Sequence, residues 1–120
     1  MNNYSTGKWA EFLARIYMRL HGCRILCRNF AAKRGTPAGE IDFIALRNHL
    51  LIFVEVKKRG NLNNAAYAIS PRQQQRIARS AAHFLQLHPQ YAGYDIRFDA
   101  VLVAPPLHLK HISNAWQLTL

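Results

Sequence analysis

The chain has 120 residues, half of them hydrophobic and thirteen aromatic (two Trp, five Tyr and six Phe), with 16 Lys and Arg against six Asp and Glu for a net charge of +10. This length and apolar content predict one domain over residues 1–120 and exclude an intrinsically disordered protein. No apolar run approaches the roughly 20 residues of a membrane span, and the N-terminus lacks a secretory signal, so we expect a cytoplasmic protein.

The excess of positive charge favours a polyanionic partner, which is nucleic acid before an acidic membrane surface. Eleven of the 16 cations are Arg, whose planar guanidinium suits phosphate. Attachment to a membrane surface would need a basic amphipathic helix, and the first predicted helix has Arg15 and Arg19 but little else. We therefore expect nucleic acid as the partner and no membrane.

The first predicted element is an amphipathic helix over residues 7–21, with Gly22 suited to its C-cap. Its apolar positions recur at helical spacing: Trp9, Leu13, Ile16, Tyr17 and Leu20. A strand is predicted over residues 23–29. In such a strand Cys23 and Cys27 lie roughly 13 Å apart, too far for a disulfide, so we expect two buried or edge thiols.

Two irregular segments, residues 31–39 and 59–70, flank a predicted β-hairpin over residues 39–59 with a polar turn at residues 47–49. Ser70 is a favourable N-cap and Pro71 a favourable first residue for a second helix, which runs to His88. The expected apolar stripe of this helix is Ile77, Ala81, Phe84, Leu85 and His88.

A last clear strand is predicted over residues 95–103, before Pro105 and Pro106. Arg97 and Asp99 share one face of this strand, which favours a structural salt bridge over a catalytic role. The tail, residues 109–118, is compatible with a short strand followed by a turn of helix, but the sequence leaves its structure undecided. His108 and His111 in that region show no metal-binding pattern.

The elements follow in the order α-β-β-β-α-β. Layer rules then give an α/β domain with a mixed central sheet flanked by helices. The helix between the third and fourth strands makes a β-α-β crossover, so these two strands are expected to be parallel.

Half of the scarce acids lie inside the apolar hairpin. A two-residue turn at residues 48–49 places Asp42 opposite Glu55 and Glu40 opposite Lys57, whereas a three-residue loop would place Asp42 and Glu55 on a diagonal. Facing carboxylates repel each other, and burial increases the cost. A divalent cation between them, Mg²⁺ or Mn²⁺, would relieve the repulsion. The ordinary alternative is that these acids face solvent and pair with Lys or Arg.

The segments GEIDFIA and FVEVKKR resemble the active-site core of the PD-(D/E)xK nucleases, the superfamily of many restriction endonucleases and Holliday-junction resolvases. More closely, the chain resembles the YraN family of small bacterial proteins. That likeness runs through GKWAEFLARIYMRLHGCRIL, RN, both hairpin segments, SPRQQQRIARSAAHFL, RFDAVLV and HISNAW. The resemblance implies a restriction-endonuclease-like αβββαβ core.

The resemblance also implies roles for individual residues. Asp42 and Glu55 would be metal ligands, with the Val56 carbonyl as a third, and Glu11 would complete the metal site. Lys57 would hold the attacking water or the scissile phosphate. Two departures concern Ile41, which stands where the superfamily motif has Pro, and the segment from 30 to 39, which is longer than in many relatives.

The candidate nucleic-acid contacts are cations near these acids, together with one amide: Lys33, Arg34, Lys58, Arg59, Arg72, Gln73, Arg76 and Arg79. Arg72, Arg76 and Arg79 share one helix face. Gln73 stands where many relatives have Lys, so it brings no charge.

The leading hypothesis is a Mg²⁺- or Mn²⁺-dependent endonuclease that hydrolyses phosphodiester bonds in DNA. The resemblance to resolvases implies a branched or structured substrate and a homodimer. The alternative is a non-catalytic nucleic-acid-binding module that keeps the nuclease fold.

Overall fold

The computed structural model describes residues 3–31, 39–60, 62 and 69–117, and it confirms the expected mixed α/β architecture. The helical elements are α1 (Asn3–Leu20), α2 (Pro71–Leu87) and a short 3₁₀ turn, η2 (Pro89–Tyr91). The strands are β1 (Arg24–Phe30), β2 (Ile41–Arg47), β3 (Leu50–Lys58), β4 (Asp95–Ala104) and β5 (His108–Trp116). The αβββαβ order is confirmed, and β5 extends it.

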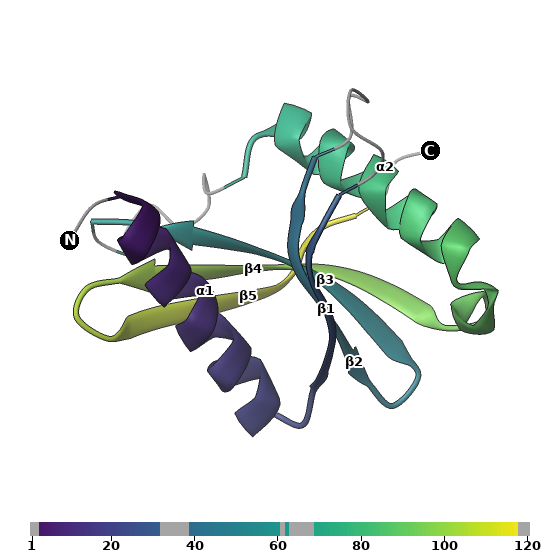
Figure 1. Ribbon diagram of the computed structural model, residues 1–120, viewed down its shortest axis with the longest axis horizontal. Helices are drawn as coiled ribbons and strands as arrows, with labels where there is room; N and C mark the ends of the chain where they lie inside the picture. The colour runs from purple at the N-terminus through teal and green to yellow at the C-terminus, as the bar shows by residue number, and fades with distance from the viewer. Residues whose placement is uncertain (1–2, 32–38, 61, 63–68, 118–120) are drawn as a thin grey trace.

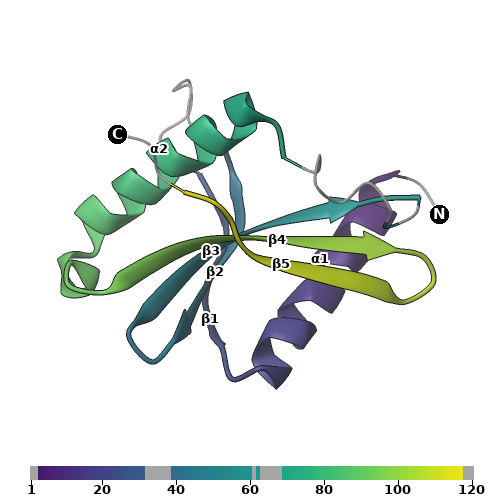
Figure 2. The same cartoon turned by 180° about the vertical axis from the view of Figure 1, so that it is seen from behind.

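The strands form one five-stranded sheet in the order β1-β2-β3-β4-β5, with α1 and α2 on opposite faces (Figures 1 and 2). Only β3 and β4 are parallel, as the intervening helix predicted; the other neighbours are antiparallel. Residues 51–56 of β3 are all buried, because helices cover both faces of this central strand. Neither α1 nor α2 has the length and apolar run that crossing a bilayer requires.

The turn between β2 and β3 has two residues, as the first of the two sequence alternatives predicted. Arg47 pairs with Leu50, and the ladder continues without a shift to Phe43 and Val54. Asn48 takes a φ of 55°, in the left-handed region that Asn tolerates better than most residues. The diagonal arrangement of the acids is therefore wrong.

The cap predictions for both helices are confirmed. Ser70 Oγ accepts the N–H of Gln73 at 3.2 Å, with Pro71 at the start of α2. Gly22 has a φ of 88° and ends α1 in a Schellman motif, in which Cys23 N–H donates to the Met18 carbonyl at 3.0 Å.

The core on the α2 side is aromatic. Ile77 and Phe84 are buried there, as the predicted stripe required. The Phe53 ring lies 6.0 Å from that of Phe84 and 5.5 Å from that of Phe98, measured between centroids. These contacts fix α2 across the middle of the sheet.

The predicted apolar stripe of α1 is confirmed only in part: Leu13 and Tyr17 pack against the core on the α1 side, whereas the two ends of the stripe do not. Trp9 and Leu20 are 43% and 80% exposed, while Ala10, Ala14 and Met18 are buried against the sheet. Small side chains allow the helix backbone to approach the sheet closely, so the Ala positions face inward although they contribute little hydrophobicity.

Two further local predictions concern the cysteines and the C-terminal tail. Cys23 and Cys27 are free thiols, one buried and one half-buried, as expected. The tail forms the strand β5 up to Trp116, and the turn of helix considered for this region is absent from its described residues.

Candidate active site

The hairpin brings Asp42 and Glu55 to one end of the sheet. They occupy the positions that follow the last ladder pair, on adjacent strands. Glu55 is only 4% exposed, so the ordinary alternative of solvent-facing acids does not apply to it. Glu40 lies before β2 begins, and its predicted pairing with Lys57 is not part of the ladder.

The Asp42 and Glu55 side chains are hydrogen-bonded to each other. Asp42 Oδ2 also accepts the backbone N–H of Val56 at 2.7 Å. Burial, followed by the hydrogen bond and the negative charge of Glu55, raises the pKa of Asp42 to about 8. Near neutral pH the Asp42 carboxyl is therefore protonated and donates to the Glu55 carboxylate, so one proton holds the pair together.

Gln73 contacts the pair from α2. Its Nε2 donates to Glu55 Oε2 at 3.0 Å. The Ser70 cap fixes the first turn of α2 and with it the position of Gln73. The structure shows the Gln73 amide holding a site carboxylate, and its contact with nucleic acid stays a prediction.

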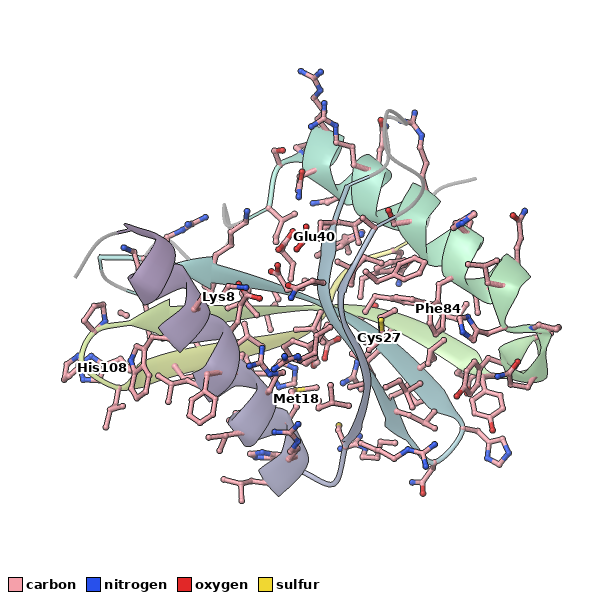
Figure 3. The ribbon with its side chains drawn as sticks, in the orientation of Figure 1. Lys8, Met18, Cys27, Glu40, Phe84 and His108 are labelled. Atoms are coloured by element: carbon pink, nitrogen blue, oxygen red, sulfur yellow. The ribbon has the colours of Figure 1, made fainter. Side chains whose placement is uncertain are left out.

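A second pair of acids lies beside the first. With its amide nitrogen oriented toward both, Asn29 donates to Glu11 Oε1 and to Glu40 Oε1, each at 3.2 Å. Burial, followed by the charge of Asp42, raises the pKa of Glu11. Figure 3 shows Glu40 in the region between the two helices. Together with Asp42 and Glu55, these residues gather four of the six acids of the chain.

Cations partly offset this negative charge. Lys57 lowers the pKa of Asp42, while Lys8 and Arg15 lower that of Glu11. Figure 3 shows Lys8 near the start of α1, on the side of Glu40. The pKa values of Asp42 and Glu11 nevertheless end above their ordinary values, so burial and the neighbouring acids outweigh these cations.

The described cations predicted to bind nucleic acid lie at or just after the end of β3 and on α2: Lys58, Arg59, Arg72, Arg76 and Arg79. Arg72 and Arg79 are exposed on α2. Arg76 is half-buried, and its carbonyl accepts the Gly39 N–H at 3.0 Å. Lys33 and Arg34 lie outside the described residues.

The donor set suits a hard divalent cation. Mg²⁺ is usually bound through one or two carboxylates and completed by water and substrate phosphate, and Asp42 and Glu55 supply that number. In the described segments, no three His, Cys, Asp or Glu side chains are grouped as a ready-made metal cage. The charge of Asp42 raises the pKa of Glu11, but Glu11 belongs to no such group, so its ligand role, like that of the Val56 carbonyl, stays a prediction.

One family of proteins matches the part of the chain that carries the candidate site. The profile described as "Uncharacterised protein family UPF0102" matches residues 10–103, which include Glu11, the whole hairpin and α2. The chain belongs to the UPF0102 family. UPF0102 is the YraN family, within the restriction-endonuclease-like superfamily, so the resemblance stated from the sequence is confirmed.

Relatives in UPF0102 are similar over nearly the whole chain. A UPF0102 protein of Rhodopseudomonas palustris strain BisB18 is 48% identical over 113 residues, covering 94% of this chain and 81% of that protein. One from Paramagnetospirillum magneticum AMB-1 is 46% identical over 112 residues, covering 93% and 87%. Among solved structures, Pyrococcus furiosus SfsA in complex with Ca²⁺ gives a TM-score of 0.35 at 17% identity, covering 93% of this chain and 63% of that chain. That structural likeness is too weak to carry an argument.

Two sets of polar contacts in this UPF0102 protein were not predicted from its sequence. Asn29 and its bridge between two acids carry no recognisable motif. The predicted Arg97–Asp99 salt bridge is confirmed at 2.8 Å, but His111, whose Nε2 lies 2.7 Å from Asp99 Oδ2, was not predicted as a partner. Asp99 stands alone in an apolar strand, and this was the signal that could have indicated a further partner, because a buried carboxylate needs several partners.

The raised pKa of Asp42 predicts how the stability of the metal-free protein depends on pH. Between the ordinary pKa of 3.8 and the folded pKa of about 8, the folded state binds more protons than the unfolded state. The contribution of Asp42 to the free energy of unfolding therefore falls as the pH rises through this window. Asp42→Asn cannot ionise, so it should be the more stable protein at pH 9, by on the order of several kcal/mol, and about equal at pH 4.

Urea unfolding in EDTA at several pH values measures this difference. Asp95→Asn is the matched control, because Asp95 is exposed at the start of β4, and its profile should follow that of the wild type. Parallel profiles for the wild type and Asp42→Asn would contradict the shared proton.

Proposed function

We propose that this protein is a metal-dependent endonuclease that hydrolyses phosphodiester bonds in DNA. The observation that carries the proposal is the buried, hydrogen-bonded carboxyl pair of Asp42 and Glu55, with Lys57 acting on the same pair. Membership of the restriction-endonuclease-like superfamily supports this chemistry. Because one fold can host many functions, the proposal depends on the site and not on the fold.

Asp42 and Glu55 would hold Mg²⁺ or Mn²⁺ in place of the proton that they share. When bound, the cation polarises the phosphate and lowers the pKa of a bound water. Val56 N–H orients Asp42, and the Gln73 amide orients Glu55, so both carboxylates are positioned in advance. Glu11 is the proposed additional acid at the metal, and the Val56 carbonyl the proposed backbone ligand.

Lys57 is the proposed electrostatic catalyst. It follows Glu55 by two residues and therefore lies on the same side of β3. Its charge already lowers the pKa of Asp42, which supports its position beside the carboxyl pair. We assign it to the scissile phosphate or the attacking water, where it would stabilise the negative charge that develops in the transition state.

The proposed substrate is branched or otherwise structured DNA in the cytoplasm, bound by a homodimer. The net charge of +10 and the basic residues that adjoin the acids support a phosphate-rich ligand. The branched form and the dimer follow from similarity to Holliday-junction resolvases. A non-catalytic nucleic-acid-binding module is the alternative that the following experiment distinguishes.

Two variants separate metal binding from chemistry. Lys57→Ala should keep its affinity for Mn²⁺, because Lys is not a ligand, but lower single-turnover cleavage by about 10²–10³-fold. Glu55→Ala should lose both. Calorimetry with Mn²⁺ and cleavage of four-way, flapped, duplex and single-stranded DNA measure the two effects.

Lys110→Ala removes the same charge from exposed β5 and is the control for Lys57→Ala, with no expected effect on cleavage. Equal and mild effects of Lys57→Ala and Glu55→Ala would rule out the nuclease. DNA binding without any cleavage would then leave the binding module.

The arginines of α2 give an independent prediction about DNA binding. If Arg72, Arg76 and Arg79 contact phosphates, replacing all three by Ala should reduce the slope of log affinity against log salt, by up to about 0.9 for each phosphate that is no longer neutralised. Fluorescence anisotropy at several salt concentrations measures this slope.

The control variant removes three exposed cations that lie elsewhere, Arg19, Arg24 and Lys110. Its slope should remain close to that of the wild type. The same reduction of the slope in both variants would mean that net charge, and not a binding surface on α2, holds the DNA.

A further inference from the structure

A second polar cavity lies on the α1 side of the sheet, away from the carboxyl pair. Its volume is about 200 Å³, and Met18, labelled beside α1 in Figure 3, forms part of its wall. The polar part of the wall consists of His21, Cys23, Arg47, Arg97, His111 and Ser113. Arg47 and Asp42 occupy opposite ends of β2, about 17 Å apart at the usual rise of a strand. This cavity is therefore separate from the candidate active site.

We propose that this cavity is a binding site for a phosphate group, with Arg47 and Arg97 as its charged ligands and His21 and His111 beside them. The proposal does not depend on the nuclease activity. It concerns residues that neither the metal chemistry nor the surface of α2 uses.

Asp99, which is fully inaccessible to solvent, contacts two residues of the cavity wall, Arg97 and His111. Arg97 binds it in a bidentate manner, through Nε and Nη2 at 2.8 Å each, and Asn114 N–H donates to it at 3.0 Å. With the contact to His111, every side of the carboxylate is occupied. Asp99 therefore holds Arg97 rigidly in place and neutralises one positive charge, while two of the five guanidinium N–H groups are used.

Arg47 supplies a charge that Asp99 does not neutralise. In the described residues its side chain makes one hydrogen bond, from Nη1 to the His21 carbonyl at 3.5 Å, which is long and therefore weak for such a bond. The aliphatic part of the Arg47 side chain passes close to Gly22. A Cβ atom placed on Gly22 would lie 3.7 Å from Arg47 Cδ. The guanidinium is thus held at the cavity wall with most of its donors available.

The imidazoles of His21 and His111 are each oriented by a contact of one ring nitrogen. His21 Nδ1 lies 2.8 Å from the Tyr17 carbonyl, so it carries the hydrogen and leaves Nε2 for a ligand. His111 uses Nε2 toward Asp99, which leaves Nδ1. The Tyr17 ring packs against both imidazoles, with centroid distances of 4.1 and 5.3 Å. Both rings are therefore fixed, and each can donate to an oxyanion when protonated.

The charge balance of the cavity favours an anion over a metal ion. Two guanidinium groups face one carboxylate, before any contribution from the imidazoles. Burial raises the pKa of the Cys23 thiol, and Arg47 and Arg97 are the first groups that oppose this, so both positive fields act within the cavity. Planar guanidinium forks bind phosphate oxygens in pairs, and this is the ligand that the geometry suits.

The phosphate could be free or part of a nucleic acid, and one experiment tests the site while distinguishing the two. Inorganic phosphate is titrated at constant ionic strength, and the imidazole NMR signals of His21 and His111 are followed. Saturable shifts are expected in the wild type. Arg47→Ala should weaken binding about tenfold or more, which is the effect of removing a charge-assisted hydrogen bond.

Arg24→Ala is the matched control. Arg24 is exposed and follows Cys23 directly, so its side chain points to the other face of β1, and the variant removes the same charge. Phosphate affinity should not change in Arg24→Ala. Equal weakening in the two variants, or shifts that do not saturate, would overturn the site. Circular dichroism of both variants verifies that they are folded.

Competition with a 5′-phosphorylated oligonucleotide and its 5′-hydroxyl form then identifies the source of the phosphate. Competition by the phosphorylated form alone supports a terminal phosphate, and competition by both supports the nucleic-acid backbone. Phosphate binding that depends on Arg47 but is competed by neither oligonucleotide supports a free phosphate ligand. Displacement that is identical in the wild type and in Arg47→Ala would contradict binding in this cavity.

Discussion

The register of β2 against β3 is the constraint on which the candidate site depends. Side chains alternate between the faces of a strand, so a shift by one residue would move Asp42 to the other face and away from Glu55. The two-residue turn and the buried ladder between Phe43 and Val54 fix this register. The apolar core that makes the hairpin stable therefore also determines which carboxyl groups meet.

Bringing those groups together has a cost, and several features of the surrounding structure reduce it. Asp42 retains a proton, the Val56 N–H donates to the same carboxyl group, and the Gln73 amide donates to Glu55. In the proposed metal-bound state a divalent cation would replace the proton, while the two N–H donors keep the carboxylates oriented. Four of the six acids of this basic protein gather in one region, which is where the proposed divalent cation would balance their charge. The excess of Lys and Arg would likewise balance the charge of the proposed nucleic acid.

The parts of the structure that follow from local patterns could be predicted from the sequence. Period-two alternation located the hairpin, Ser70 and Pro71 located the start of α2, and the crossover rule gave the parallel pair. The stripe of α1 could be predicted only in part, because Leu13 and Tyr17 do pack against the sheet side but Ala10 and Ala14 lie deepest, and their small size matters more than their hydrophobicity. The bridge from Asn29 and the contact of His111 with Asp99 join residues far apart in the chain, and no spacing rule identifies such contacts.

The alanine contact of α1 links the packing of the core to the geometry of the acids. Glu11 directly follows Ala10 on the helix, so the depth at which the helix lies on the sheet also sets the distance from Glu11 to Asp42. A larger side chain at position 10 or 14 would lift the helix and carry the carboxylate of Glu11 outward with it. The thickness of the contact between α1 and the sheet thus determines where Glu11 lies. A chain with every acid intact could still lose its site through a bulkier residue at one of these two positions.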